Sequence, residues 1–414
     1  MNFRESMYFI IIICIITAPS IATAQNTISS SEYATSIDTA NKQLLNHDYY
    51  LAIGSYGNAI ALNSYSVDAW TGKGYAHYAL GQYKLANLCS DRAIKIDSNQ
   101  SDPWILKGIA LYNLGEYDKA LNAFNEAAEI DTNSVNLWIG KGTVLCALEQ
   151  YTEAIDSFDK AIMVDPNSTA PWIGKGMIFY ALGRYDEAIN SFNRIIEISP
   201  KSADPWIAKG AAFLKMDQYD KAIASFNNAI EIDPKSLASL LGNGMMHLVV
   251  GQYEEALKSF DRSIEINPKF ADSWVGRGLS LYNLGRYNES ISSFDRAIEI
   301  DPNMANSWNG KGLALLAVHR EAESKKAFQK AQAIPDRYET SQEPIEMNVE
   351  FTAYNEPGKL FVQGWFIPAI GIIVVIVITK QALGIEYCYE HSTTTTCTKT
   401  GMTETSTHKI CIDP

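Results

Sequence analysis

Few residues in this chain are able to carry out acid–base, nucleophilic or metal chemistry, and those few lack the spacing that such chemistry needs. Only six histidines occur among the 414 residues. His77 and His247 fall on a helix face that we expect to be buried, which favours a structural role. No nucleophile elbow, phosphate-binding loop, zinc-protease helix or dinucleotide-binding fingerprint occurs in a fitting context. We therefore expect a protein that is not an enzyme and that uses no cofactor.

The C-terminal tail holds the remaining group of residues with ligand chemistry. Cys388 and His391 are three residues apart, as are His408 and Cys411, and Cys397 lies between the two pairs. Such pairs can ligate zinc. Their wide separation, the threonine-rich filler and the odd number of cysteines instead favour a disordered tail or one disulfide. We therefore predict no metal site.

The charge balance excludes one large class of partners. The chain has 34 Lys and Arg against 47 Asp and Glu, a formal net charge of −13. Nucleic-acid binding needs clustered cations that displace counterions from phosphates. We therefore expect a protein or peptide partner rather than nucleic acid.

The first residues are typical of an export signal. Arg4 precedes an apolar run over 7–16, and Ala22-Thr23-Ala24 supplies small residues for cleavage before Gln25. The alternative is an uncleaved anchor, although the run is shorter than the ~20 residues that span a bilayer. Either way, we expect the chain behind residues 1–24 to be exported. Asn99, Asn167 and Asn288 begin N-x-Ser/Thr sequences and would then be available for glycosylation.

A second apolar segment, 360–379, is a candidate transmembrane helix. Trp365 and Lys380 flank it as interfacial residues would. The alternative is a buried strand, favoured by the many Ile and Val residues and by Pro368 and Gly371. If the segment spans, the protein is anchored in the cell membrane with its larger part outside. The regions outside the repeats described next are 1–24 (signal), 25–32 (linker), 339–359 (linker or short hairpin), 360–379 (apolar segment) and 380–414 (Thr/Cys-rich tail).

A 34-residue period fills the middle of the chain. Each repeat begins its pattern with a tryptophan, and only Leu240 replaces it. Counted from this position, called a column when followed through all repeats, glycine stands four residues later and tyrosine thirteen residues later. Alanine or serine stands sixteen residues later, and phenylalanine twenty residues later. The tryptophans are Trp70, Trp104, Trp138, Trp172, Trp206, Trp274 and Trp308. Apolar residues at offsets 0, +4 and +7 form one face of a helix, and a second amphipathic helix follows a Leu-Gly stop such as Leu182-Gly183. Neither helix buries its apolar face alone, so stacked units must create the core. A Lys or Arg column at +3 is interpreted as structural, because its stem packs while its charge reaches water.

This pattern resembles the tetratricopeptide repeat, and its Lys-Gly variant is similar to long proteins of that kind in methanogenic archaea. The resemblance implies an all-α fold, a right-handed α-solenoid of helix-turn-helix units. We place nine units over 33–338, the first of them weaker because Ser36 replaces tryptophan. The units are 33–66, 67–100, 101–134, 135–168, 169–202, 203–236, 237–270, 271–304 and 305–338.

The resemblance also implies that a second stripe of the first helices, at offsets −2, +1, +5 and +8, lines a concave peptide-binding groove. This stripe is aliphatic and tyrosyl with an acidic rim. It lacks the Lys, Arg and Asn that clamp a terminal carboxylate in some relatives, and some +1 residues are expected to pack against adjacent units instead. The predicted groove residues are Tyr78, Asp102, Ile105, Tyr112, Ile139, Ile173, Met177, Tyr180, Asp204, Ile207 and Tyr282.

Two functions fit these observations. The first is a non-catalytic scaffold at the cell envelope that binds a peptide or protein segment, apolar with basic flanks, in the groove. The alternative is a self-assembling envelope spacer without a dedicated ligand.

Overall fold

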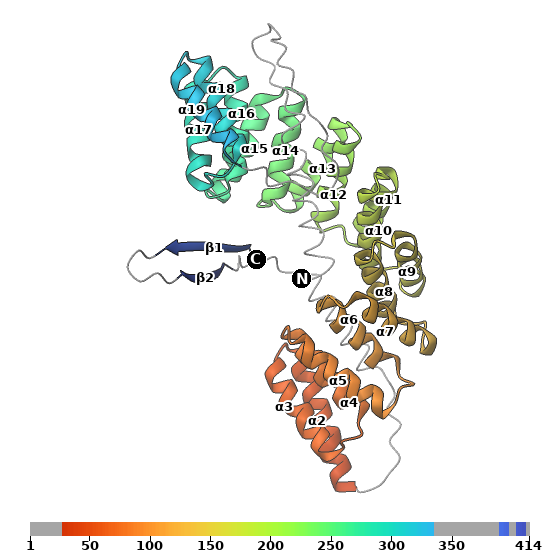
Figure 1. Ribbon diagram of the computed structural model, residues 1–414. Coiled ribbons are helices and arrows are strands. Elements are labelled where there is room, and N and C mark those ends of the chain that lie inside the picture. Colours follow the sequence, from red (N-terminus) through yellow and green to blue (C-terminus); the bar gives the residue numbers. More distant parts are fainter. Residues whose placement is uncertain (1–26, 335–388, 397–402, 411–414) are drawn as a thin grey trace. The chain divides into compact units, whose positions relative to one another are not determined.

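The computed structural model describes residues 27–334, 389–396 and 403–410 (Figure 1). Over 27–334 these residues form eighteen consecutive helices, α2 to α19. The helices divide into two compact units, and the division falls within α10, between Gly174 and Lys175. The predicted all-α solenoid of helix-turn-helix pairs is thereby confirmed for this part of the chain.

Each pair consists of a first helix, which carries the tryptophan column, and a second helix, which begins at the tyrosine column. The first helices are α2 (Thr27–Leu45), α4 (Val67–Ala79), α6 (Ser101–Asn113), α8 (Val135–Ala147), α10 (Ala170–Ala181), α12 (Asp204–Lys215), α14 (Leu237–Val249), α16 (Ala271–Asn283) and α18 (Ala305–Ala317). The second helices are α3 (Tyr49–Leu62), α5 (Tyr83–Ile96), α7 (Tyr117–Ile130), α9 (Tyr151–Val164), α11 (Tyr185–Ile198), α13 (Tyr219–Ile232), α15 (Tyr253–Ile266), α17 (Tyr287–Ile300) and α19 (Glu321–Gln332).

The turn within each pair is a left-handed helix stop. Gly183 has φ of +72°. Its amide donates to the Tyr180 carbonyl at 3.1 Å, and the next amide, of Arg184, donates to the Phe179 carbonyl at 2.8 Å. This geometry satisfies the last carbonyls of the first helix, and glycine adopts it without strain. Glycine occupies this position in five of the nine described turns, and His47, Glu149, Asp217 and His319 occupy it in the other four with positive φ.

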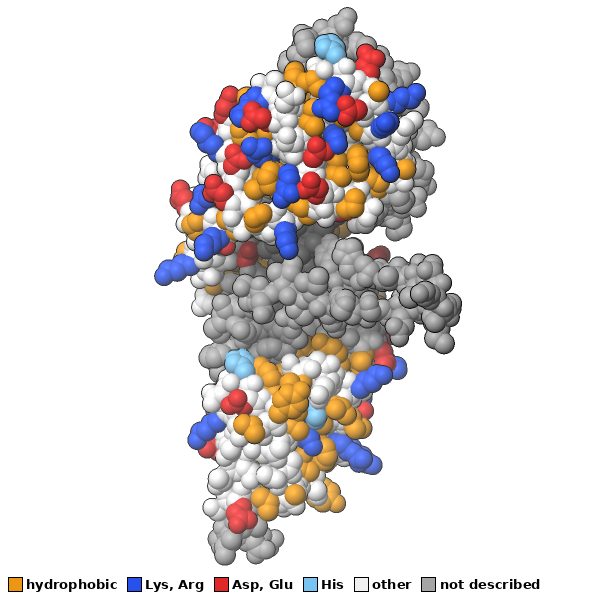
Figure 2. Space-filling model, turned by 90° about the vertical axis from the view of Figure 1, so that its left-hand side faces the viewer, with side chains coloured by type: hydrophobic (Ala, Val, Ile, Leu, Met, Phe, Trp, Pro, Cys, Tyr) orange, Lys and Arg blue, Asp and Glu red, His pale blue; other side chains and the backbone are white. Residues whose placement is uncertain are grey.

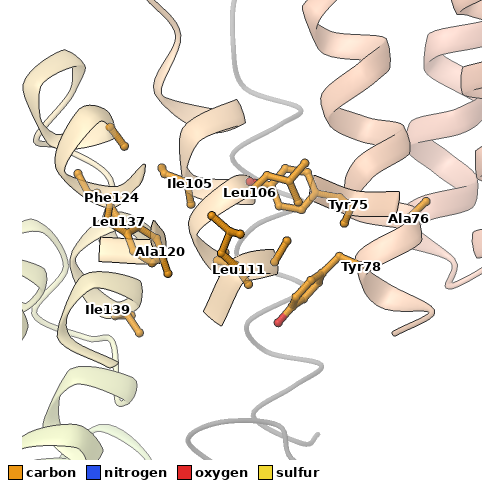
Figure 3. Close-up of a cluster of buried hydrophobic side chains, with 14 of the residues drawn as sticks. Tyr75, Ala76, Tyr78, Ile105, Leu106, Leu111, Ala120, Phe124, Leu137 and Ile139 are labelled. Atoms are coloured by element: carbon orange, nitrogen blue, oxygen red, sulfur yellow. The ribbon is translucent and has the colours of Figure 1, made fainter. Parts of the chain in front are cut away.

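In five of the nine described pairs, the core is built around one phenylalanine ring held between two glycines. The Phe124 ring, fully buried, lies against Gly108 of α6 and Gly140 of α8. A Cβ atom at these two glycines would lie 2.8 Å and 2.4 Å from the ring. Only glycine permits the helices to approach the ring this closely. Figure 3 shows Phe124 among the buried side chains of the first compact unit.

The second pair departs from this rule and compensates for the departure. Ser90 replaces the phenylalanine, and Leu106 replaces the glycine of the following helix. The Leu106 side chain fills the space that the ring would occupy, since a Cβ at Gly74 would lie 2.5 Å from Leu106 Cδ2. Two substitutions in consecutive repeats therefore preserve one packed layer.

The tryptophans sit at the start of the first helices and are held by polar contacts. The Trp104 indole N–H donates to the Ser98 carbonyl at 3.0 Å. Lys107 Nζ lies 5.4 Å from the Trp104 ring centroid and 2.8 Å from an Asp91 carboxylate oxygen of the preceding helix α5. Arg277 forms the equivalent pair with Asp261 at 2.7 Å. At Lys107, Arg277 and Lys311 the +3 cation thus forms an ion pair with the preceding repeat, which supports the structural interpretation at these positions.

The described part of the tail contains strand rather than helix. β1 (Tyr389–Thr396) pairs antiparallel with β2 (Thr403–Ile410), with His391 opposite His408. β-branched threonines favour this conformation, which the sequence reasoning did not predict.

The predictions on the signal 1–24, the apolar segment 360–379, and Cys388, Cys397 and Cys411 lie outside the described residues. None of the helices in the described part of the chain combines the length and hydropathy that a membrane crossing requires.

Candidate functional site

The predicted site residues lie on the first helices of the pairs. The two predicted aspartates, and Asp272 at the same position of a later repeat, lie in the first turns of these helices. Asp102 is in the first turn of α6, Asp204 begins α12, and Asp272 is in the first turn of α16. A helix N-terminus favours a nearby carboxylate. All three are half-buried, and none has an ion-pair partner among the residues that the structure describes.

These aspartates are desolvated, and each faces a second aspartate of its own pair. Burial, together with the charges of Asp131 and Asp68, raises the pKa of Asp102 to about 6. Burial and the charge of Asp233 raise the pKa of Asp204 to about 6, and the Asp272 carboxyl, facing Asp301, behaves alike. Removing a carboxylate from water without a cation is unfavourable. A cationic group brought to these positions would lower the pKa values.

The predicted tyrosines are not isolated side chains but members of aromatic pairs. Tyr112 contacts Tyr117 with ring centroids 5.6 Å apart, and Tyr180 contacts Tyr185 at 5.5 Å. Each pair spans the helix turn, so the second helix fixes the orientation of the ring on the first. The two remaining predicted tyrosines form the same kind of pair: Tyr78 with Tyr83 at 5.5 Å and Tyr282 with Tyr287 at 5.4 Å.

The tyrosines differ in accessibility. Tyr78 is 7% exposed and its hydroxyl accepts a hydrogen bond from Asn113 Nδ2 at 3.2 Å, which joins two consecutive first helices. Tyr112, Tyr180 and Tyr282 are half-buried. Burial raises the pKa of the Tyr180 phenol above its ordinary value. The three half-buried rings therefore present neutral aromatic surface and a hydroxyl, while Tyr78 mainly serves packing.

The aliphatic members of the predicted site need a correction. Ile105 and Ile207 are 1% and 2% exposed, and Ile139 and Ile173 are each 7% exposed. Such side chains offer a ligand almost no surface, because packing within the array already covers them. The four predicted isoleucines of the +1 column are thus core residues. Met177 is half-buried and remains a predicted contact residue.

Sequence reasoning missed two kinds of residue that the structure adds to this face. The first is the partner ring, such as Tyr117, which enters the sequence analysis only as part of the 34-residue period. The second is the facing aspartate, such as Asp131 or Asp233. The sequence holds a regular signal for both. The partner ring follows the groove tyrosine by five residues, and the facing aspartate follows the first-turn aspartate by 29 residues.

Stacked helix-turn-helix pairs of this kind define an α-solenoid. Tetratricopeptide repeat models match residues 203–236, and overlapping ones match 241–305 and 275–338. A TPR repeat model matches 176–217, and the model of anaphase-promoting complex, cyclosome, subunit 3 matches 79–161. Residues 176–236 and 241–338 of the chain thus match tetratricopeptide repeat models. Proteins of this class typically mediate protein–protein interaction and are generally non-catalytic.

Solved structures share the fold at low sequence identity. The C-terminal part of a TPR repeat-containing protein from Cytophaga hutchinsonii is 17% identical, with a TM-score of 0.48; the match covers 58% of this chain and 98% of that one. Pseudomonas aeruginosa pilF is 16% identical with a TM-score of 0.45 over 50% and 95% of the two chains. Yeast Tom70 is 16% identical with a TM-score of 0.43 over 76% and 70%. A search of curated proteins finds no match.

Proposed function

We propose that this protein is a non-catalytic scaffold that binds a protein or peptide segment on the face carrying the tyrosine pairs and the first-turn aspartates. The bound segment is apolar with Lys or Arg at its flanks. The observation that carries the proposal is the set of unpaired, desolvated carboxylates Asp102, Asp204 and Asp272, which recur at one position of the repeat.

Physical chemistry links these carboxylates to a basic ligand. Their raised pKa values mean that the ionised form, which dominates at neutral pH, is less stable in the free protein than the same carboxylate would be in water. A Lys or Arg placed beside them recovers part of that free energy, whereas an acidic ligand adds repulsion. Perturbed carboxylates of this kind concentrate at functional sites. The neighbouring Tyr112 and Tyr180 supply apolar area with few rotatable bonds and a hydroxyl for a peptide backbone.

The test uses the full chain and two synthetic peptides that differ only in their flanks. One has an apolar centre with lysines at both ends, and the other has glutamates there. We expect the lysine peptide to bind more tightly at pH 7.5 than at pH 5, and added salt to slow its association. The double variant Tyr112→Ala/Tyr180→Ala should weaken binding by about 1–4 kcal/mol without loss of helicity.

The matched control is Asp118→Asn, because Asp118 is exposed on the second helix α7. Asp102→Asn/Asp204→Asn should abolish the preference for the lysine peptide, and Asp118→Asn should leave it intact. Equal affinity of both peptides for the unmodified chain, or equal effects of the two sets of substitutions, would show that this face is not the binding surface.

The location of the protein is part of the proposal. The apolar segments 7–16 and 360–379 support export and membrane anchoring with the array outside. Protease added to intact cells should then digest the array and spare a short C-terminal fragment. Release of the whole protein by high salt without detergent would exclude the anchor.

A further inference from the structure

The second helix of the first pair, α3, presents an exposed face without any charge. No Asp, Glu, Lys or Arg occurs in Tyr49–Leu62. Tyr50 is 74% exposed, Leu51 60% and Leu62 42%. Between them on the same face lie Gly54 and Asn58, also exposed. An apolar stripe of this length on an otherwise soluble helical pair marks an interaction surface.

The other repeats provide an internal comparison. Every other second helix of the described array exposes at least one charged side chain on this face. Examples, one per helix from α5 to α19, are Lys84, Lys119, Glu153, Asp186, Lys221, Glu254, Glu289 and Glu323. In Figure 2, charged side chains are fewer on the lower region, where Figure 1 places α2 to α5, than on the upper region. Position in the repeat therefore does not explain the uncharged face of α3.

The middle of this face is open enough for another helix to approach closely. A Cβ atom at Gly54 or Gly57 would meet no atom within 4 Å, whereas the glycines of the core are tightly covered. No described neighbour thus requires glycine at either position. Glycine in an exposed helix interior lowers stability by about 1 kcal/mol relative to alanine. A close helix contact made only in an assembly accounts for both residues.

We propose that two copies of this chain associate by packing α3 against α3 of the second copy, antiparallel about a two-fold axis at the level of residue 56. The exposed stripe is symmetric about that level, so Tyr50 lies opposite Leu62 of the copy, Leu51 opposite Ala61, and Gly54 opposite Asn58. Large side chains at the ends then flank small ones in the middle. Such a self-complementary patch closes as a dimer.

The charge of the chain selects a second copy over a lipid surface. Binding to an anionic membrane uses Lys and Arg on the polar flanks of the apolar face, and α3 has none. A net charge of −13 makes most of the surface repel a second copy, and α3 is the described second helix that escapes this repulsion. Charge repulsion thus disfavours the other surfaces and leaves α3 as the favoured dimer interface.

The available area meets the lower limit of a specific interface. Tyr65 is 79% exposed beside α3, and Leu85 and Leu88 of α5, 44% and 54% exposed, extend the apolar face by one repeat. Together with the α3 residues they offer on the order of 500 Å² per copy, or roughly 1,000 Å² in total. We therefore expect a reversible dimer rather than an obligate one. This inference is independent of the proposed peptide-binding face.

The experiment is sedimentation velocity of the full chain in a mild detergent over a range of concentrations. The unmodified chain should form dimers in a concentration-dependent manner. Leu51→Lys should raise the dissociation constant at least tenfold. Met163→Lys is the matched control, since Met163 is an 82% exposed apolar residue on α9, and it should have no effect. Circular dichroism should show equal helicity for all variants.

A compensating variant tests the arrangement itself. Ala61→Glu alone should weaken the dimer, and Leu51→Lys/Ala61→Glu in one chain should restore it. The two positions are ten residues apart, about 15 Å along α3, so their charges can pair only between copies. Recovery to within threefold of the unmodified dissociation constant is expected.

Four results would overturn the proposal. A chain that stays monomeric at all concentrations excludes the dimer. A dimer that responds equally to Leu51→Lys and Met163→Lys forms elsewhere, for example through the apolar segment 360–379. Loss of flotation with phosphatidylcholine vesicles in Leu51→Lys, without a change in the dimer, would assign the face to lipid. Failure of the double variant to recover would exclude the antiparallel register.

Discussion

Replacing Gly140 by alanine tests whether the aromatic ring between two glycines determines the stability of the array. The new Cβ atom would lie 2.4 Å from Phe124 Cζ, about 1 Å inside an ordinary contact. The ring cannot retreat, because Gly108 holds its other side, and Phe124 is fully buried. The helices must therefore separate. Overpacking of this kind costs up to about 3 kcal/mol, and alanine returns about 1 kcal/mol of helix propensity. We expect a net loss of about 2 kcal/mol.

The control is Gly57→Ala in α3, where the added methyl group meets no atom within 4 Å. Both variants are compared at chain concentrations low enough to keep the protein monomeric, because Gly57 lies in the proposed dimer contact. That substitution should raise stability by about 1 kcal/mol. Urea unfolding followed by circular dichroism measures both changes, and hydrogen exchange should place the loss in α6, α7 and α8. The double variant Gly140→Ala/Phe124→Leu should recover at least 1 kcal/mol relative to additivity. If Gly140→Ala stabilises the chain as Gly57→Ala does, the packing argument is wrong.

Three further predictions concern polar and thiol groups. The pKa of Asp204 is about 6 in the folded chain and 3.8 as a reference, so the native state binds more protons between about pH 4 and 6 and stability falls as pH rises through that window. Asp204→Asn should therefore increase the free energy of unfolding at pH 7.5 by at most about 3 kcal/mol, and the melting temperature should rise with it. At pH 4 the substitution should change neither quantity much. Arg277→Met, which breaks the bonds to Asp261 and to Ser293 Oγ, should destabilise the chain by about 1–2 kcal/mol, and the loss should shrink in high salt. Burial raises the pKa of the Cys146 thiol to about 12, so alkylation by iodoacetamide at pH 8 should be much slower in the folded than in the urea-unfolded chain.

The repeat register could be predicted because it depends on residue volume at fixed spacing. Trp, Gly, Ala and Phe recur every 34 residues, and a missing Cβ or a ring at one position constrains the next repeat directly. The turn stops were equally accessible, since Leu182-Gly183 implies a left-handed residue. The helix-turn-helix structure predicted for one repeat could thus be assigned to every repeat, which accounts for all eighteen helices of the described array.

The site could be predicted only in part, because exposure depends on neighbours that the sequence does not reveal. Ile105 and Tyr112 belong to one predicted stripe, yet the first is core and the second is half-buried. The stacking of one repeat on the next decides this difference. Asp102 is predicted as part of an acidic rim, and the structure places it in the first turn of α6. Its desolvation beside Asp131 could not be foreseen, because the two carboxylates are brought together by the return of the second helix.

The exchange of Phe for Ser90 and of Gly for Leu106 has a consequence for how such a chain changes in length. Arrays of this kind grow and shrink by duplication or deletion of whole repeats. Deletion of 237–270 would place Gly276 against the Phe226 ring in the position that Gly242 now holds, so the seam would close without a misfit. Deletion of 67–100 would instead bring Leu106 against the Tyr56 ring, which now requires Gly72. Deletion of 101–134 would leave Ser90 facing Gly140 across an empty space. The second and third repeats can therefore be gained or lost only together.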